Sequence, residues 1–367
     1  MSFITSIGTA NPQYKFNQSE LADFMVRSMQ LSAADERKLR AVFRMSGIDT
    51  RYSVMDDFGK KGDFSFFNNT QSIEPQPSTR QRLELFRNQS LQLSKTAIEN
   101  CLRTHPDFNR TAVTHLIVVS CTGMYAPGLD IDLVHSLGLR STVERTCINF
   151  MGCYAAFNAI KLANTFCASD VNAKVLIVCT ELCSIHFQRE PTDDNFLANA
   201  LFGDGSAALL VEATPRKGLN LKPVAFHCDL AMDGQADMSW TIGDLGFEMR
   251  LSAYVPEVIK NGIAKLTASL LARMAYRISD ISYFAIHPGG KRILEVIEEK
   301  LGLTKTNSQA SYSVLKSYGN MSSPTVLFVL KEIGNNLNGV DNGRKIMSFA
   351  FGPGLTLESM ILEIQSC

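Results

Sequence analysis

A cysteine at the start of an almost uncharged helical pattern is the residue of this sequence best suited to nucleophilic chemistry. Cys153 follows Phe150–Gly152 and opens a run to about Cys167 in which Lys161 is the only charge. A helix that is apolar on all faces is normally buried, and its first turn offers unpaired N–H groups and a partial positive charge. A thiol there is prone to ionise. The alternative is an inert core cysteine, because free Cys often behaves as a small hydrophobe.

Two further segments supply a base and a hydrogen-bond donor. The apolar run Tyr283–Ile286 stops at His287, which Pro and two Gly follow, and strand ends in open α/β sheets face the ligand crevice. Asn320 lies in a polar, Gly-bearing loop at 317–324, where its amide can donate into a cleft. Taken singly, the histidine and the asparagine are equally typical of structural roles at strand ends and turns. Together with Cys153 they supply nucleophile, base and donor.

The elements that must position these residues alternate between apolar strand patterns and helical patterns, as an α/β fold requires. We predict strands over His115–Ser120, Lys174–Thr180, Ala207–Glu212, Ile281–Ile286, Lys345–Ala350 and Thr356–Ile364. We predict helices over Ser19–Leu31, Glu36–Ser46, Arg80–Leu102, Cys153–Ser169, Val255–Ala275, Arg292–Leu301 and Ser323–Gly334. Both halves repeat strand, Gly/Pro turn and helix, a repetition that suits a duplication divided near 213–220 without proving it alone. The stretch 58–82, with its Gly, Asn and Pro residues, predicts a long surface loop.

Composition indicates a small-molecule enzyme with a large core. The 367 residues are 45% hydrophobic, and 36 basic side chains balance 36 acidic ones, so no overall field favours nucleic acid or an acidic membrane. The nine cysteines form no CxxC pair and are odd in number, which argues against zinc and for a reducing compartment. No run of 18 apolar residues and no basic, apolar leader is present. We therefore expect a cytoplasmic protein without a membrane span or a metal site.

The order of the motifs resembles the type III polyketide synthases, the chalcone synthase-like branch of the thiolase superfamily. Cys153 precedes His287 in His-Pro-Gly-Gly and Asn320 in Gly-Asn-Met-Ser-Ser. Further matches extend along nearly the whole chain, at Ile7–Pro12, Ala200–Gly205 and Phe351–Leu355. One departure is Ala350, where the family usually has Gly.

The resemblance implies a thiolase fold, in which duplicated βαβαβαββ halves give a five-layered αβαβα architecture. It places the half with the nucleophilic Cys at 1–215 and the half with the catalytic His and Asn at 216–367. It also implies a homodimer, in which the turn Met124–Gly128 reaches into the partner's cavity. Ala126 stands at the position of the family's protruding Met, which leaves more room there.

The chemistry implied by the resemblance uses CoA thioesters as substrates and no cofactor. Cys153 and His287 form a thiolate–imidazolium pair that takes the acyl group of an acyl-CoA starter. Malonyl-CoA then loses CO2, and the Nε2–H of His287 and the amide of Asn320 stabilise the resulting enolate. The enolate carbon attacks the acyl thioester, and repeated cycles build a chain that cyclises to a pyrone or resorcinol-type product, as in bacterial alkylpyrone and alkylresorcinol synthases.

The resemblance also assigns a gate and a pocket. Phe202 resembles the gate that orients malonyl for decarboxylation, with an ordinary core aromatic as the alternative. The implied pocket residues are Cys121, Thr122, Cys183, His186, Ala198, Trp240, Met249 and Ser322. Cys183 stands where plant chalcone synthases have Thr, and its surroundings resemble bacterial relatives that take long fatty acyl starters. Trp240 and Met249 replace Gly and Phe of the plant enzymes, so we expect a fatty rather than a coumaroyl starter.

Two assignments keep alternatives. His186 replaces another pocket Thr and is interpreted as a polar pocket group, a second base for ring closure or a packed histidine. The helical pattern at 36–46 carries Lys38, Arg40 and Arg44 where the family binds CoA phosphates. Only Lys38 aligns directly with a family basic position, and a solvated helix face is the alternative.

Two other functions have the same residue types. An initiating ketoacyl-acyl carrier protein synthase of fatty-acid biosynthesis shares the Cys-His-Asn logic but condenses once, and it looks different around His287 and Asn320. A catalytically silent homologue would serve as a scaffold, and the intact Cys153, His287 and Asn320 argue against it.

Overall fold

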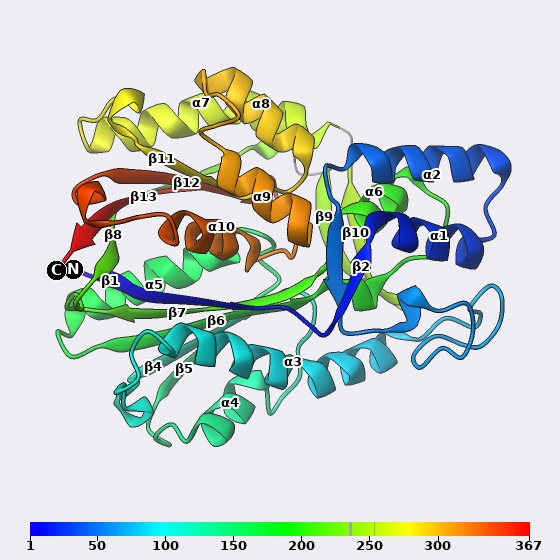
Figure 1. Cartoon of the computed structure of the whole chain (residues 1–367), viewed down its shortest axis with the longest axis horizontal. Coiled ribbons are helices and arrows are strands. Elements are labelled where there is room, and N and C mark those ends of the chain that lie inside the picture. Colours follow the sequence, from blue (N-terminus) through cyan, green and yellow to red (C-terminus); the bar gives the residue numbers. More distant parts are fainter. Residues whose placement is uncertain (235–236, 253) are drawn as a thin grey trace.

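The largest feature of the computed structural model, which describes all residues except 235, 236 and 253, is a nine-stranded sheet. Its order is β11-β12-β13-β8-β1-β7-β6-β4-β5. These strands are β1 (Phe3–Ala10), β4 (His115–Ser120), β5 (Glu144–Asn149), β6 (Lys174–Leu182), β7 (Asp204–Glu212), β8 (Leu219–Leu230), β11 (Tyr283–Ile286), β12 (Lys345–Gly352) and β13 (Thr356–Ser366). Between β1 and β8 the register holds only one pair, Ile4 with Leu221. The sheet therefore divides there into two layers (Figure 1).

Helices and the two sheet layers alternate, which confirms the predicted five-layered α/β architecture (Figure 1). One outer layer holds α7 (Val255–Arg273) and α8 (Lys291–Leu301), and the other holds α3 (Thr79–Leu102) and α4 (Leu129–Leu137). Between the sheet layers lie α5 (Ala155–Ser169) and α10 (Thr325–Gly334), and α9 (Gln309–Tyr318) packs against α8 and α10. Each of the three helix layers packs on the sheets through its own apolar cluster.

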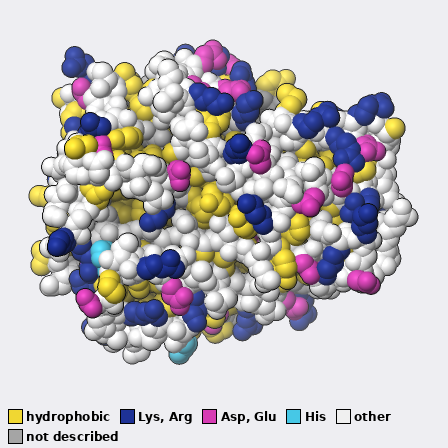
Figure 2. Space-filling view, in the orientation of Figure 1, with side chains coloured by type: hydrophobic (Ala, Val, Ile, Leu, Met, Phe, Trp, Pro, Cys, Tyr) yellow, Lys and Arg dark blue, Asp and Glu magenta, His cyan; other side chains and the backbone are white. Residues whose placement is uncertain are grey.

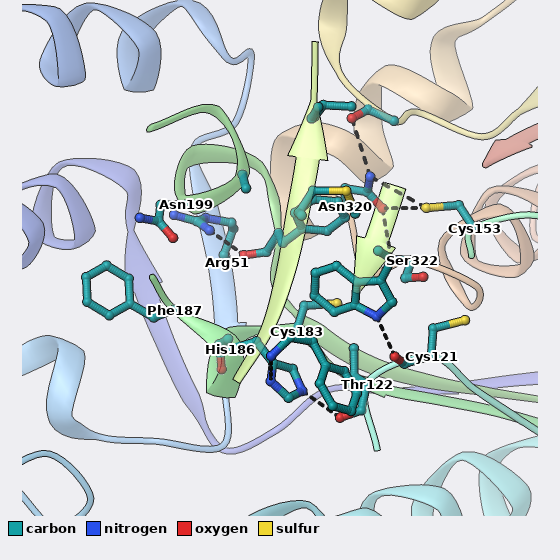
Figure 3. A pocket seen from close by; sticks show the side chains of 18 of the residues that line it. Arg51, Cys121, Thr122, Cys153, Cys183, His186, Phe187, Asn199, Asn320 and Ser322 are labelled. Atoms are coloured by element: carbon teal, nitrogen blue, oxygen red, sulfur yellow. Dashed lines mark hydrogen bonds between the residues drawn. The ribbon is translucent and has the colours of Figure 1, made fainter. Parts of the chain in front are cut away.

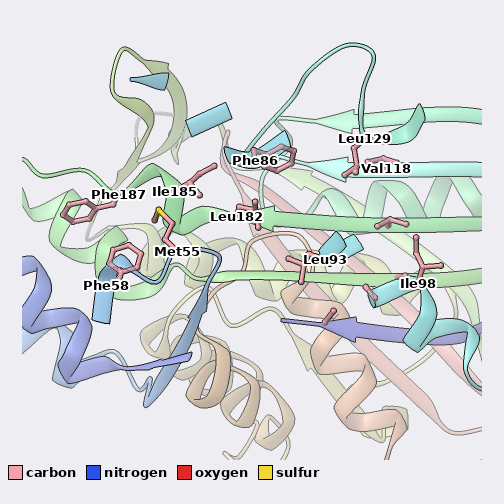
Figure 4. Packing of buried hydrophobic residues seen from close by; sticks show 14 of the residues in the cluster. Met55, Phe58, Phe86, Leu93, Ile98, Val118, Leu129, Leu182, Ile185 and Phe187 are labelled. Atoms are coloured by element: carbon pink, nitrogen blue, oxygen red, sulfur yellow. The ribbon is translucent and has the colours of Figure 1, made fainter. Parts of the chain in front are cut away.

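Close packing between layers requires small residues at particular places. A side chain at Gly8 of β1 would put its Cβ 2.0 Å from the backbone nitrogen of Cys101 in α3. The strand and the helix therefore approach each other at a distance that only glycine allows. Figure 4 shows part of the cluster on this side of the sheet, where Phe86, Leu93 and Ile98 of α3 cover the strands.

Shorter elements collect beyond one end of the sheet layers (Figure 1). They are β2 (Tyr14–Asn17) paired with β3 (Thr50–Ser53), the hairpin β9 (Met238–Gly243) and β10 (Gly246–Leu251), and the helices α1 (Gln18–Met29), α2 (Ala33–Met45) and α6 (Asp193–Leu201). On the face shown in Figure 2, basic and acidic side chains are interspersed. Within the described residues, no helix combines the length and apolar character needed to cross a bilayer.

Every predicted strand and helix corresponds to an element of the structure, and β4 has the predicted bounds. The largest difference that matters for the site is at α5, which begins at Ala155 rather than Cys153. Elements that were not predicted include the strands β2, β3, β5 and β8, the hairpin β9–β10, and the helices α4, α6 and α9. In β8, the strand pattern is interrupted by Pro223.

The prediction of a surface loop over 58–82 was wrong in two respects. The helix α3 already begins at Thr79, and within the loop Phe67 and Ile73 are buried in the core. The buried carboxylate of Asp57 accepts hydrogen bonds from the backbone N–H groups of Ser65, Phe66 and Phe67 at 2.7–2.8 Å. This satisfies backbone donors that an aromatic-rich loop would otherwise bury without partners.

Candidate active site

All the residues predicted for the catalytic centre, the gate and the pocket line one cavity. They are Cys121, Thr122, Cys153, Cys183, His186, Ala198, Phe202, Trp240, Met249, His287, Asn320 and Ser322. The cavity encloses about 1180 Å³ including its open mouth. It lies where the ends of β4, β6 and β11 meet the turn before α5, the loop before α10 and the hairpin β9–β10 (Figure 3). The roles of these residues stay predictions.

Cys153 is held in a tight turn between β5 and α5. It precedes Tyr154, the N-cap residue of α5, so it stands just outside the helix. Gly152 has φ +80°, and a Cβ there would lie 2.4 Å from Cδ of Pro353. The turn therefore requires glycine, because it combines a left-handed backbone with close contact to the C-terminal Gly-rich loop.

The amide of Asn320 faces the thiol. Its Nδ2 lies 4.0 Å from Sγ of Cys153 and donates to the carbonyl of Gly289 at 3.4 Å. Its Oδ1 accepts a hydrogen bond from the backbone N–H of Ser322 at 2.8 Å. Oδ1 also lies 3.9 Å from Sγ of Cys153, so both ends of the amide border the thiol. Nδ2 carries two N–H groups and the Gly289 contact uses one of them, which leaves one donor for the cavity.

The backbone of Asn320 pairs with the segment that carries Phe202. The N–H of Asn320 donates to the carbonyl of Leu201, and the N–H of Gly203 donates to the carbonyl of Asn320, both at 2.9 Å. These two bonds form an isolated bridge between Phe202 and Asn320. The predicted gate and the predicted amide donor are thus fixed to one another.

Burial keeps both members of the predicted nucleophile–base pair neutral in the free site. His287 is only 1% exposed, and within the described chain neither ring nitrogen has a hydrogen-bond partner. Burial lowers its pKa to about 3. The Cys153 thiol is reachable from the cavity, yet burial raises its pKa to about 12, and hydrogen bonds from Ser322 and Asn320 oppose this only in part. Desolvation thus opposes both charges of the expected thiolate–imidazolium pair, which stays a prediction.

Both ring nitrogens of His186 are engaged. Nε2 lies 2.7 Å from the carbonyl oxygen of Thr122, and Nδ1 accepts from the backbone N–H of Phe247 at 3.0 Å, which assigns the proton to Nε2. The ring stacks on Phe247 at 4.2 Å, and burial lowers its pKa to about 3. Of the three interpretations, these contacts favour a packed histidine. It joins the hairpin β9–β10 to the end of β4.

Trp240 and Glu181 extend this anchoring. The indole Nε1 of Trp240 donates to the carbonyl of Cys121 at 2.7 Å, which fixes β9 across the cavity.

The buried carboxylate of Glu181, which the sequence analysis did not identify, accepts from Thr122 Oγ1 at 2.7 Å and Ser323 Oγ at 2.6 Å. Burial raises its pKa. The sequence signal that could have identified Glu181 is its position as an acidic residue near the end of a largely apolar strand, β6.

The cavity also has an apolar wall that the sequence did not indicate. Its residues come from β2, α1, the turn after β3 and the segment after β6: Phe16, Leu21, Met25, Phe58 and Phe187. Figure 3 shows Phe187 and Asn199 across the cavity from Cys153, with Cys183 and His186 between them. Figure 4 shows Phe58 and Phe187 beside one another, with ring centroids 6.4 Å apart. Amphipathic patterns in α1 and β2 give no sign of which apolar residues face a ligand.

The predicted CoA-binding residues lie on α2, which packs against α6. They are not among the residues that line the cavity. Lys38 pairs with Asp193, and Arg40 pairs with Asp23 at 2.7 Å and Glu36 at 2.8 Å. Exposed ion pairs of this kind contribute little, so they do not prevent contact with a phosphate.

Comparison with known proteins supplies further observations. The family models for the N-terminal and C-terminal domains of chalcone and stilbene synthases match residues 1–215 and 227–365. The chain is 31% identical to an "alpha-pyrone synthesis polyketide synthase-like Pks18" of Mycobacterium tuberculosis, over 99% of this chain and 91% of that protein. It is 30% identical to a "putative chalcone synthase" of Bacillus subtilis, over 99% of both.

Two solved structures are similar over nearly the whole chain. The polyketide synthase PKS-I of the brown alga Ectocarpus siliculosus superposes with a TM-score of 0.92 at 30% identity, over 99% of this chain and 98% of that one. The C-terminal type III polyketide synthase domain of Steely1 from Dictyostelium superposes with a TM-score of 0.89 at 28% identity, over 99% of both chains.

The low pKa of His287 predicts a pH dependence of stability. The folded protein holds this ring neutral down to a pKa of about 3, whereas the unfolded chain protonates it near the ordinary value of 6.5. Its stabilising contribution is complete above pH 6.5 and decreases as the pH falls. We expect the melting temperature of His287→Gln to decline less between pH 6.5 and pH 4 than that of the unsubstituted protein. Replacing the exposed His135 by Gln should leave the decline unchanged, and parallel curves for His287→Gln would contradict the assignment.

Proposed function

Because this chain belongs to the chalcone and stilbene synthase family of type III polyketide synthases, which are acyltransferase-type enzymes, we propose that it extends a fatty acyl-CoA with malonyl-CoA. The starter is loaded on Cys153, and repeated decarboxylative condensations precede cyclisation to a pyrone or resorcinol-type product. The observation that carries the proposal is the convergence of Cys153, His287 and Asn320 in a cavity with an apolar wall. CoA thioesters are the substrates, Lys38, Arg40 and Arg44 contact CoA phosphates, and the scheme includes no cofactor.

Loading starts from the neutral pair. Sγ of Cys153 attacks the thioester carbonyl while its proton passes to the imidazole of His287. The C–S bond to CoA then breaks, and the CoA thiolate takes the proton back from the imidazolium. A neutral imidazole is the form that can accept this proton, which agrees with the lowered pKa of His287.

Extension uses the same groups as donors. In malonyl-CoA the bond to CO2 breaks, and its electron pair forms an enolate whose oxygen accepts from Asn320 Nδ2 and His287 Nε2–H. The enolate carbon then bonds to the acyl carbon on Cys153, and the acyl C–S bond breaks. Support comes from the position of Asn320 Nδ2, which lies 4.0 Å from Sγ of Cys153 and keeps one N–H group free of the Gly289 contact.

The apolar wall supports a fatty starter. Phe16, Leu21, Met25, Phe58 and Phe187 line the cavity and provide surface for an alkyl chain. Figure 3 shows Phe187 across the cavity from Cys153. The relative from Mycobacterium tuberculosis is named for alpha-pyrone synthesis, which agrees with a pyrone product.

We also propose that the protein is a homodimer. β5 is an edge strand that pairs with β4 on one side only, and its side chains are mostly exposed. Edge strands with open backbone groups pair readily with another strand. This one leads directly into the turn that carries Cys153, so pairing through β5 would bring two active sites close to the interface.

Substitutions should separate the two chemical steps. Cys153→Ala should lose all chain extension and retain some malonyl-CoA decarboxylation, because the donors to the enolate remain. Asn320→Ala should still accept an acyl group on Cys153 and should slow decarboxylation about a hundredfold, since one enolate donor contributes about 3 kcal/mol. Mass spectrometry of the acylated protein and release of labelled CO2 measure the two steps. An acyl group found on Cys147 or Cys183 instead would show that the nucleophile is misassigned.

Starter length should depend on Cys183. Each buried methylene contributes about 0.8 kcal/mol, so we expect kcat/KM to rise through hexanoyl-, octanoyl- and decanoyl-CoA until the chain fills the apolar wall. Cys183→Phe should abolish this gain and spare acetyl-CoA, whereas the control Cys228→Phe, at an exposed cysteine, should keep it. Equal losses for acetyl- and decanoyl-CoA would exclude Cys183 from the acyl path.

The oligomeric state tests the dimer directly. Light scattering at micromolar concentration should give a mass twice the 40.5 kDa of one chain. A stable monomer under these conditions would contradict the proposal.

A further inference from the structure

The buried guanidinium of Arg51 contacts Phe202, the proposed gate, and has no role in the reaction scheme proposed above. Arg51 of β3 is 5% exposed and is placed across the cavity from Cys153 (Figure 3). Its Nη1 donates to the carbonyl of Phe202, and its Nε donates to Oε1 of Gln18 at 2.9 Å. Among the described residues no carboxylate lies close enough to form an ion pair with it, and the negative charge that acts on it is that of the buried Asp204, farther away. A buried cation without such a partner is costly, and burial lowers its pKa to about 9.

We propose that Arg51 is a positioning residue for malonyl-CoA decarboxylation, acting through Phe202 and Asn320. This inference rests on the proposed function of the site. Arg51 and its partner Gln18 donate to carbonyl groups at the C-terminal end of α6. The last turn of a helix leaves such C=O groups without partners inside the helix. Gln18 Nε2 donates to the carbonyl of Ala200 at 2.7 Å, and Arg51 donates to that of Phe202. A cation is also favoured at this end of the helix by the helix dipole.

The contact extends from Phe202 to the catalytic amide. The residues on either side of Phe202 bond to the backbone of Asn320 at 2.9 Å. The Arg51 side chain also fills the space between the two segments. A Cβ added at Gly319 would lie 2.7 Å from Cδ of Arg51, and one added at Gly203 would lie 3.4 Å from its Cβ. Arg51 therefore packs against both chain segments that form the Phe202–Asn320 bridge.

The planar guanidinium of Arg51 donates hydrogen bonds in two fixed directions, from Nε to Gln18 and from Nη1 to Phe202. Lysine keeps the positive charge but cannot donate from two fixed directions to Gln18 and Phe202 together. In Arg51→Lys we therefore expect the segments to shift relative to each other, and the amide of Asn320 to move with them. Misplacement of about 1 Å in a reacting assembly costs up to about a hundredfold in rate.

The experiment compares three variants in two assays. Labelled CO2 release from malonyl-CoA gives kcat and KM for decarboxylation, and mass spectrometry gives the rate of octanoyl transfer from octanoyl-CoA to Cys153. For Arg51→Lys we expect kcat for decarboxylation to fall about tenfold or more, with KM and the loading rate changed less than about threefold. Arg216→Lys, which weakens a partly buried ion pair with Glu212 on β7, away from the cavity, should change neither assay. Gln18→Met, which removes the acceptor of Arg51 Nε and the donor to Ala200, should lower the same kcat.

A double-mutant cycle tests the route of action. If Arg51 acts through Asn320, Arg51→Lys should cost much less in an Asn320→Ala background than alone. Equal losses in loading and decarboxylation, or full additivity of the two substitutions, would overturn the proposal. Its failure is distinct from failure of the proposed function, which would appear as normal decarboxylation by Asn320→Ala alone.

Discussion

The backbone bridge between Phe202 and Asn320 is the contact on which the arrangement of the candidate catalytic residues depends. It joins the segment after α6, in the part of the chain that carries Cys153, to the loop before α10, in the part that carries His287. The two sheet layers meet at one register pair between β1 and β8, so strand pairing there is a minor link between them. At the cavity, the bridge and the donors to Glu181 hold the loop before α10 against the strand ends.

Burial sets the electrostatic character of this site. The thiol of Cys153, the imidazole of His287 and the carboxylate of Glu181 all have pKa values shifted towards their neutral forms by desolvation. Arg51 is the exception, since its lowered pKa of about 9 still leaves it charged near neutral pH. Donors that are desolvated in this way would form strong hydrogen bonds to an enolate, because little water competes for them.

Motifs with fixed local spacing were predictable, and contacts across the fold were not. Cys153, His287 and Asn320 stand in short segments whose chemistry and order point to one site, and the structure places them in one cavity. Arg51 and the apolar wall lie far from these motifs in sequence, and nothing in their local patterns distinguishes a ligand-facing residue from a core residue. The division of the chain at 215/216 stays a prediction, as do the catalytic roles.

Local signals also failed where tertiary contacts compete with them. The start of α5 was placed two residues early because Tyr154 provides no side-chain cap that would mark the boundary. The thiolate predicted for Cys153 followed from the helix dipole, whereas the depth of burial, which decides its pKa, depends on residues from other elements. The loop after β3 was expected at the surface, and its aromatic side chains instead joined the core once Asp57 satisfied its backbone.

The anchoring of the hairpin β9–β10 has a consequence for how such a protein can diversify. The hairpin is held by the Trp240 hydrogen bond and by the His186–Phe247 contact. Neither contact involves Cys153, His287 or Asn320, the residues proposed to do the chemistry. Substitutions between these anchors can deepen or shorten the cavity while the reacting groups keep their positions. The same catalytic centre can thus be inherited unchanged by enzymes whose products differ in size.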